Sequence, residues 1–83
     1  MERNSIIEKL REILVLALGS SADEILENCT ESSLLVEDLG LNSVGILYVV
    51  IGIEEVFEVS FNGVSFNDFK TIGDVVDFIQ KNI

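Results

Sequence analysis

Histidine, proline and tryptophan are absent from this chain of 83 residues, and cysteine occurs once, at Cys29. Histidine is the usual general base beside a nucleophilic serine or cysteine, so its absence argues against hydrolytic chemistry. A lysine could replace it in principle, but Lys9, Lys70 and Lys81 lie far along the chain from Ser43, the candidate nucleophile. A single thiol closes no internal disulfide, and without histidine it builds no zinc or iron–sulfur site. We therefore expect a non-catalytic protein without a metal site, in a reducing compartment.

Basic residues and long hydrophobic runs are both scarce. The 5 lysines and arginines stand against 15 acidic residues, and the net charge of -10 repels phosphate backbones and anionic bilayers. We expect no nucleic-acid partner and favour a basic surface on another protein. Residues 13–18 are too short for a signal peptide, and residues 44–53 supply about half of a membrane span. The chain should be cytoplasmic, without a transmembrane segment, and form one domain over residues 1–83.

A first helix is predicted over residues 5–18. Ser5 and Glu8 form a capping pattern, and Gly19 supplies a stop. A connection of about twenty residues follows, in which Ser21 and Glu24 repeat the capping pattern and predict one short helical turn. The residues expected to form the first apolar stripe or to pin the connection to the core are Ile6, Leu10, Ile13, Leu14, Ala17, Leu34, Leu35 and Val36.

Residues 43–57 predict a second long helix, with Asn42 as its N-cap and Gly40 allowing a tight approach. The many β-branched residues also fit a buried strand, but the length and the cap favour a helix. The expected core stripe consists of Val44, Leu47, Val50 or Ile51, and Phe57, with Glu54 and Glu55 outside.

Residues 59–66 carry an Asn-Gly pair between alternating segments, which is the mark of a β-hairpin. A lone hairpin is only marginally stable. We therefore expect an extended loop with a turn at Asn62-Gly63, then a short helix containing Phe66 and Phe69. Thr71 caps a last helix with Asp74 in its first turn. The predicted fold is all-α: a small four-helix bundle with three main helices, one short helix and a long loop between the first two main helices.

Ser43 stands at the predicted start of the second long helix. Serine is common in a first turn because it bonds local backbone donors, so a purely structural role is one interpretation. The glycine-containing approach, the unpaired N–H groups and the positive helix end also make a favourable seat for a phosphate. A phosphodiester on Ser43 would meet those donors.

Residues 38–44, Asp-Leu-Gly-Leu-Asn-Ser-Val, resemble the DLG-x-DSL motif of acyl carrier proteins. The resemblance extends over the whole chain and includes Glu54, Glu55, Phe57, Phe61, Phe69 and the closing TIGDVVDFI. It implies that Ser43 carries 4′-phosphopantetheine, installed from coenzyme A by a phosphopantetheinyl transferase. The thiol of that arm would hold acyl groups as thioesters and present them to acyl-loading and acyl-transferring enzymes. The cofactor-binding residues implied beside Ser43 are Asp38, Leu39, Gly40, Asn42 and Val44.

An acyl pocket between the helices also follows from the resemblance. The candidate lining residues are Val44, Leu47, Val50, Phe61, Phe66, Phe69 and Ile72. Each CH₂ that a chain buries there would be worth about 0.8 kcal/mol. The same residues could be only the core of a small bundle, and both interpretations hold together because a pocket in so small a protein must be made from its core.

Two departures from the family pattern affect partners. Asn42 replaces an aspartate, which keeps the helix cap but removes a carboxylate that the modifying enzyme and its metal commonly contact, so modification should need a particular transferase. The second long helix is apolar rather than acidic at its early and outer positions, which we take to be Gly45, Ile46, Tyr48, Gly52 and Val56.

Exposed apolar patches mark partner surfaces or self-association. Together with Val15 and Leu16, this face predicts a monomer with weak self-association and a carrier dedicated to an unusual partner. The expected setting is lipid, cell-envelope or secondary-metabolite biosynthesis rather than general fatty acid biosynthesis. The alternative is an unmodified helical interaction module that docks through the apolar helix; Asn42 favours the module, and the intact serine favours the carrier.

Overall fold

The structure, a computed structural model, describes residues 2–61 and 69–83. These residues form the helices α1 (Arg3–Leu18), α2 (Ala22–Glu27), α3 (Ser43–Phe57) and α4 (Ile72–Asn82), with a 3₁₀ turn, η1 (Gly19–Ser21), before α2. No strand occurs in the part of the chain that is described. The predicted all-α fold of three long helices and a short one is confirmed.

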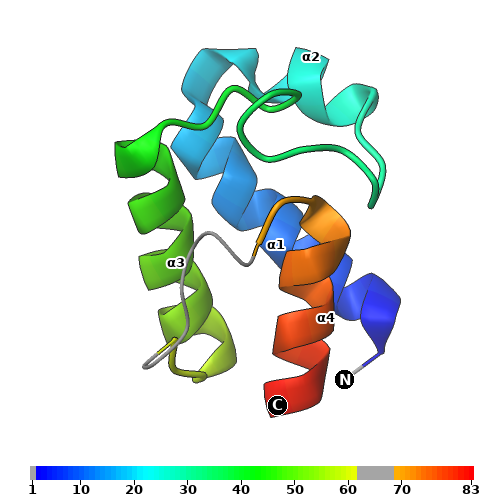
Figure 1. Ribbon diagram of the computed structural model, residues 1–83, viewed down its shortest axis with the longest axis vertical. Coiled ribbons are helices and arrows are strands. Elements are labelled where there is room, and N and C mark those ends of the chain that lie inside the picture. The colour runs from blue at the N-terminus through cyan, green and yellow to red at the C-terminus, as the bar shows by residue number, and fades with distance from the viewer. Residues whose placement is uncertain (1, 62–68) are drawn as a thin grey trace.

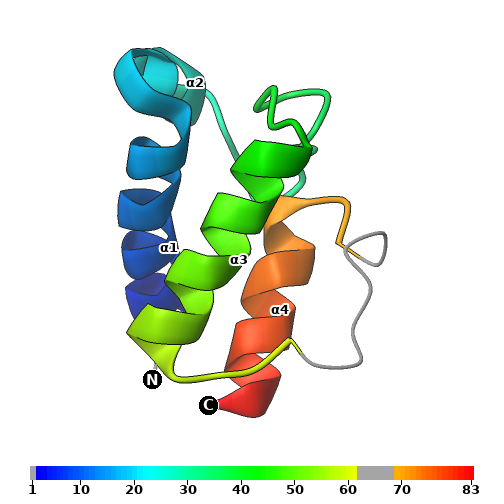
Figure 2. The ribbon, with the colours of Figure 1, turned by 90° about the vertical axis from the view of Figure 1, so that its left-hand side faces the viewer.

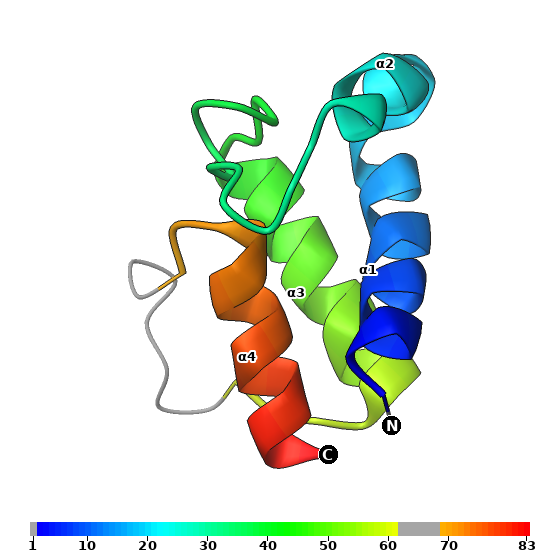
Figure 3. The same ribbon diagram turned by 90° about the vertical axis from the view of Figure 1, so that its right-hand side faces the viewer.

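The three long helices lie side by side, and α2 lies across one end of them (Figure 1). Both chain ends lie at the opposite end of the bundle (Figures 2 and 3). The long connection that follows α2 runs over the end of the bundle where α2 lies and leads to the start of α3 (Figure 3). In the described residues, no helix has both the length and the hydropathy that crossing a membrane requires.

Two predicted caps are wrong. Helix α1 begins at Arg3, before Ser5, and no side chain caps it. Its first turn is instead held by the Arg3 guanidinium, which pairs with Glu31 and Asp77. Ser21 does stand at the N-cap of α2, but its backbone continues the preceding 3₁₀ turn at φ -87° and ψ -4°, so its hydroxyl does not reach the helix N–H groups.

The predicted cap of α4 is confirmed. The Thr71 hydroxyl accepts a hydrogen bond from the Asp74 N–H at 3.1 Å, and the Asp74 carboxylate accepts one from the Thr71 N–H at 3.1 Å. This reciprocal pair satisfies two N–H groups at the helix start. The core stripe of α4 consists of Ile72, Val75, Val76 and Ile79, which are all buried.

The core stripe of α3 differs from the prediction. Val50 and Phe57 are buried as expected, and of the two alternatives Val50 is the inner residue while Ile51 is 49% exposed. Val44 and Leu47, by contrast, are 75% and 49% exposed, contrary to the prediction. The buried residues of α3 are Val49, Val50, Ile53 and Phe57, with Ile46 packed against them. Gly52, expected to face outward, lies against Ile13 of α1. Helix α3 is therefore rotated relative to the prediction, because contact with α1 selects its inner face.

The connection before α3 is more ordered than the sequence suggested. Leu34 and Thr71 form an isolated antiparallel bridge, and the Leu35 N–H donates to the Lys70 carbonyl at 2.9 Å. Leu35 is buried as expected, whereas Val36 is 58% exposed. The turn at Asn62-Gly63 and the short helix around Phe66 fall outside the described residues, and Phe69 itself is not helical. The loop from α2 and the segment before α4 thus hold each other in place beside α3.

Candidate functional site

Ser43 is the first residue of α3, and its side chain is exposed. The preceding residue fixes this position: Asn42 is extended, and its side-chain oxygen accepts a hydrogen bond from the Gly45 N–H at 2.8 Å. The Asn42 carbonyl accepts the first helical bond, from the Ile46 N–H at 2.9 Å. The predicted N-cap is therefore confirmed, and it holds the hydroxyl of Ser43 at the helix tip.

Two backbone N–H groups remain at this tip. Those of Ser43 and Val44 donate to no acceptor in residues 2–61 and 69–83. They stand at the positive end of the α3 dipole, where anions are stabilised. No basic side chain is needed for such a seat, because backbone donors and the dipole act together on a phosphate. A phosphate ester on Ser43 fits the donors that this chain places there.

The residues before Asn42 shape the approach to the helix. The Asp38 carboxylate accepts a hydrogen bond from the Leu34 N–H at 2.7 Å, which closes a tight loop. Leu39 is 1% exposed and anchors that loop in the core. Gly40 has φ +76°, a conformation that residues with a side chain rarely adopt. These three residues of the motif act on the loop backbone, and they bring Ser43 to the surface.

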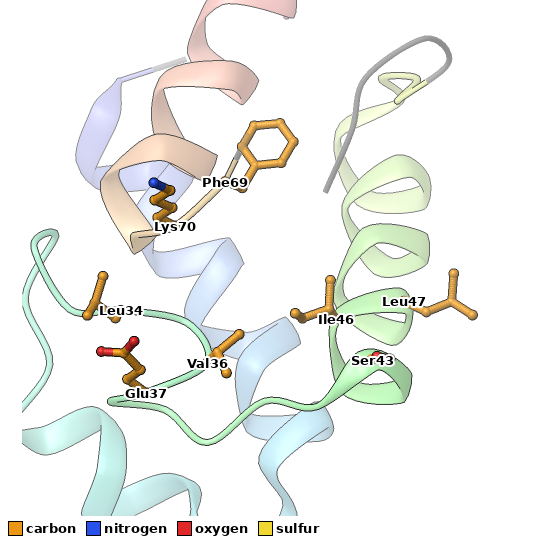
Figure 4. Close-up of a pocket in the computed structure, with 8 residues that line it drawn as sticks. All are labelled: Leu34, Val36, Glu37, Ser43, Ile46, Leu47, Phe69 and Lys70. Atoms are coloured by element: carbon orange, nitrogen blue, oxygen red, sulfur yellow. The ribbon is translucent and has the colours of Figure 1, made fainter. Parts of the chain in front are cut away.

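A surface pocket of about 700 Å³ lies beside Ser43. Its lining comes from three segments: the loop, the start of α3 and the segment before α4 (Figure 4). The lining residues are Leu34, Val36, Glu37, Ser43, Ile46, Leu47, Phe69 and Lys70. Figure 4 shows Ile46 reaching from α3 toward the loop, while Leu47 points away from it. We call this space the outer pocket.

Sequence reasoning missed Lys70 as a residue of this pocket. Lys70 lies far along the chain from Ser43, yet the bridge between Leu34 and Thr71 brings its segment to the rim. The Asp74 carboxylate fixes that segment further by accepting hydrogen bonds from the Lys70 N–H and the Thr71 N–H, and these bonds lower the pKa of Asp74. The pairing of two distant loops could not be read from local patterns.

The predicted acyl-pocket residues separate into groups. Val44 is exposed, and Leu47, which is 49% exposed, borders the outer pocket, so neither lines the interior, contrary to the prediction. Val50, Phe61 and Phe69 line a cavity of about 20 Å³ between α3 and α4, which we call the inner cavity. Ile72 instead lines a separate pocket of about 200 Å³ beside α1 and α2. Phe66 falls outside the described residues.

Residues 8–79 match the family described as the phosphopantetheine attachment site. Together, the fold and this match define a helical carrier domain that bears phosphopantetheine. Proteins with similar sequences define the kind of carrier more closely. The acyl carrier protein of Coprothermobacter proteolyticus is 35% identical over 83 residues, which cover 100% of this chain and 96% of the relative. That of Borreliella burgdorferi is 37% identical over 81 residues, covering 98% and 96%.

A third relative, the acyl carrier protein of Phytoplasma australiense, is 33% identical over 78 residues, which cover 94% of this chain and 97% of the relative. The chain therefore belongs to the acyl carrier protein family. Membership implies a covalently attached 4′-phosphopantetheine, a phosphopantetheinyl transferase that installs it, and partner enzymes that use the loaded arm. The resemblance drawn from residues 38–44 is confirmed, and the unmodified interaction module is not favoured.

Proposed function

We propose that Ser43 is the attachment residue and that residues 1–83 form one carrier domain. The supporting observation is the exposed hydroxyl on the first residue of α3, with a pocket next to it and, beside it, two N–H groups that donate to no acceptor in the described residues. The prosthetic group supplies a thiol that holds an acyl group as a thioester. The chain's own contribution is to present the hydroxyl, seat the phosphate and shelter the arm.

The neighbouring residues take separate roles in this proposal. Asn42 and Gly40 set the helix tip, and Asp38 and Leu39 hold the loop. Val44 supplies one of the two N–H donors while its side chain stays in solvent. Lys70 borders the same pocket, but within the described residues its side chain makes no hydrogen bond or ion pair with another residue of the pocket. We propose that the chain is a carrier without catalysis of its own.

The experiment is modification in cells. The chain is co-expressed with a broad-specificity phosphopantetheinyl transferase, and intact masses are compared for wild type, Ser43→Ala and Ser32→Ala. Ser32 is an exposed loop serine and serves as the matched control. We expect wild type and Ser32→Ala to gain the mass of one phosphopantetheine, and Ser43→Ala to gain none. Equal gain on Ser43→Ala would place the attachment elsewhere.

We further propose that an apolar face of α3 serves a dedicated partner in a specialised lipid, cell-envelope or secondary-metabolite pathway in the cytoplasm. The exposed apolar residues on this helix are Val44, Leu47, Tyr48, Ile51 and Val56. The first four recur at helical spacing and form one stripe. The stripe carries no charge, so partner binding should depend only weakly on salt. A steep loss of affinity with added salt, measured by calorimetry, would show that charge still dominates.

A further inference from the structure

A second pocket, between α1, α2 and the start of α4, lies apart from Ser43. It measures about 200 Å³, and it shares no lining residue with the outer pocket or with the inner cavity. The loop that follows α2 also contributes to its wall, through residues 29–31. We call this space the α1 pocket. Nothing in its wall depends on the attachment at Ser43.

Most of the side chains that line the α1 pocket are apolar. These are Ile7, Leu10, Leu14, Leu26 and Ile72. All but Ile7 are at most 7% exposed, so the packing of the three helices holds them in place. An apolar cavity of about 150 Å³ already binds a molecule of the size of benzene. The α1 pocket therefore suits the apolar part of a small organic molecule.

Arg11 supplies hydrogen-bond donors at the rim of the α1 pocket. Its Nη2 donates to the Leu26 carbonyl at 2.9 Å, and this bond orients the guanidinium beside the pocket. A guanidinium carries five N–H donors and accepts no hydrogen bond. Within the described residues, Arg11 makes no other hydrogen bond and no ion pair. A ligand of the α1 pocket should therefore present a hydrogen-bond acceptor to Arg11.

The charges around Arg11 favour an acceptor that is uncharged. Glu31 also lines the α1 pocket, but its carboxylate is paired with Arg3. Arg11 borders a neighbouring groove as well, and the acidic residues of that groove are Glu8, Glu12, Asp23 and Glu27. An anion drawn to the one guanidinium would be repelled by these carboxylates, and an ammonium group accepts no hydrogen bond. A carbonyl oxygen accepts from Arg11 without bringing a charge.

We propose that the α1 pocket is a second binding site, which takes a small neutral acyl ester. The apolar chain of the ester packs against the leucine side chains of α1 and α2, and its carbonyl oxygen accepts a hydrogen bond from Arg11. The site is distinct from the proposed attachment residue, so it is tested with and without a prosthetic arm.

Cys29 gives a direct probe of occupancy, because it lines the α1 pocket and is the only cysteine of the chain. The full chain with Ser43→Ala is used, so that no arm adds a second thiol, and intact mass confirms this. The rate of Cys29 alkylation by iodoacetamide is measured with increasing methyl hexanoate. Hexanoate and hexylamine are the charged counterparts of similar length. In wild type, the leucine and isoleucine methyl resonances are followed by NMR during the same titrations.

We expect methyl hexanoate to slow the alkylation of Cys29 at least threefold at saturation and to shift the methyl resonances of Leu10, Leu14 and Leu26. Affinity should rise about fourfold for each CH₂ added from methyl butanoate to methyl hexanoate. Hexanoate and hexylamine should bind at least tenfold more weakly than the ester.

Two variants test the wall and the donor separately. Arg11→Met keeps an unbranched apolar stem but removes the donors, and it should weaken the binding of methyl hexanoate about tenfold. Lys9→Met makes the same change of charge on α1 outside the pocket and should leave binding unchanged. Ile7→Phe places a ring in the pocket and should abolish binding. If Ile7→Phe does not fold, the exposed position of Arg11 keeps the comparison available.

Any of four results would overturn the proposal. Methyl hexanoate leaves Cys29 alkylation unchanged, or it shifts only residues that line the inner cavity, such as Val50 and Val75. Hexanoate or hexylamine binds as tightly as the ester, which would show that the site does not select a neutral ligand. Arg11→Met binds the ester as well as Lys9→Met does, which would show that Arg11 is not the donor.

Discussion

Single side chains at helix starts set the geometry of the proposed attachment site. Asn42 caps α3 and leaves the exposed Ser43 hydroxyl at its tip. Thr71 and Asp74 cap α4, and Asp74 also accepts a hydrogen bond from the Lys70 N–H at 2.9 Å. The cap of α4 thus reaches into the segment that borders the outer pocket. Local hydrogen bonds at these residues position both sides of the site.

The charge of Asp74 should make an acid-sensitive contribution to stability. Hydrogen bonds from the Lys70 and Thr71 N–H groups lower the pKa of its carboxyl below the ordinary value of 3.8. A carboxyl with a lowered pKa stabilises the fold fully above its unfolded pKa, and this contribution is lost as the pH falls through the folded pKa. We expect Asp74→Asn to be less stable than wild type at neutral pH, and the difference to vanish in acid.

Urea unfolding of both proteins from about pH 7 down to about pH 2 measures this difference. Glu55→Gln removes one exposed carboxylate of α3 and is the control for net charge. Its free energy of unfolding should run parallel to that of wild type. A gap between Asp74→Asn and wild type that stays constant with pH would contradict the expected role of the carboxylate.

At the scale of elements, the contact between α1 and α3 decides which face of α3 is inside. Gly52 of α3 lies so close to α1 that an added Cβ would stand 2.9 Å from Cγ2 of Ile13. Glycine weakens a helix by about 0.8 to 1.0 kcal/mol relative to alanine, so its presence here needs a compensating gain. The gain is the close approach of two helices, which turns Val44, Leu47 and Ile51 outward.

Gly52→Ala should therefore destabilise the protein, although alanine favours helix. Overpacking a filled core costs about 1–3 kcal/mol, which offsets the gain in helix propensity of about 1 kcal/mol and leaves a net loss of up to about 2 kcal/mol in the free energy of unfolding. Ile13→Ala removes the obstructing atoms, so Gly52→Ala should become stabilising in that background. A double-mutant cycle by urea unfolding measures the coupling. Additive effects would show that the two residues do not collide.

At the scale of the whole molecule, one guanidinium joins three segments. Arg3 of α1 forms an ion pair with Glu31 of the loop and another with Asp77 of α4, the latter at 2.8 Å, and also donates to the Gln80 side chain at 2.9 Å. These contacts, of which the Glu31 hydrogen bond is the strongest influence, raise the pKa of Arg3. With 15 acidic residues against 5 basic ones, few basic side chains are available to form ion pairs between segments, so each such ion pair matters more for stability.

Arg3→Met should lower the melting temperature, and the loss should shrink as salt is added, because salt screens exposed charges over about 10 Å at 0.1 M and about 3 Å at 1 M. Lys9→Met removes one exposed charge from the same helix and controls for the change in net charge. Wild type itself should melt higher in salt, since self-repulsion at a net charge of -10 is screened. Calorimetric scans at several salt concentrations test this, and equal losses for the two variants at low salt would contradict the role of Arg3.

The sequence by itself determined what depends on neighbours along the chain. The number of long helices, the stop at Gly19 and the caps at Asn42 and Thr71 are local features, because each is a backbone geometry set by a few consecutive residues. The family was recognisable for the same reason: residues 38–44 form one continuous motif. Ser5 failed as a cap because a long-range ion pair of Arg3 extends α1 past it.

Only the tertiary structure decided which face of α3 is buried and which residues share a pocket with Ser43. Nearly every position from 44 to 53 is apolar or glycine, so the sequence predicts a helix but does not indicate which of its faces is buried. The buried face is selected by the packing of Gly52 against Ile13, a contact between residues far apart in the chain. Lys70 and Phe69 reach the site in the same way, through the bridge between Leu34 and Thr71. Packing between distant segments is what a local pattern does not encode.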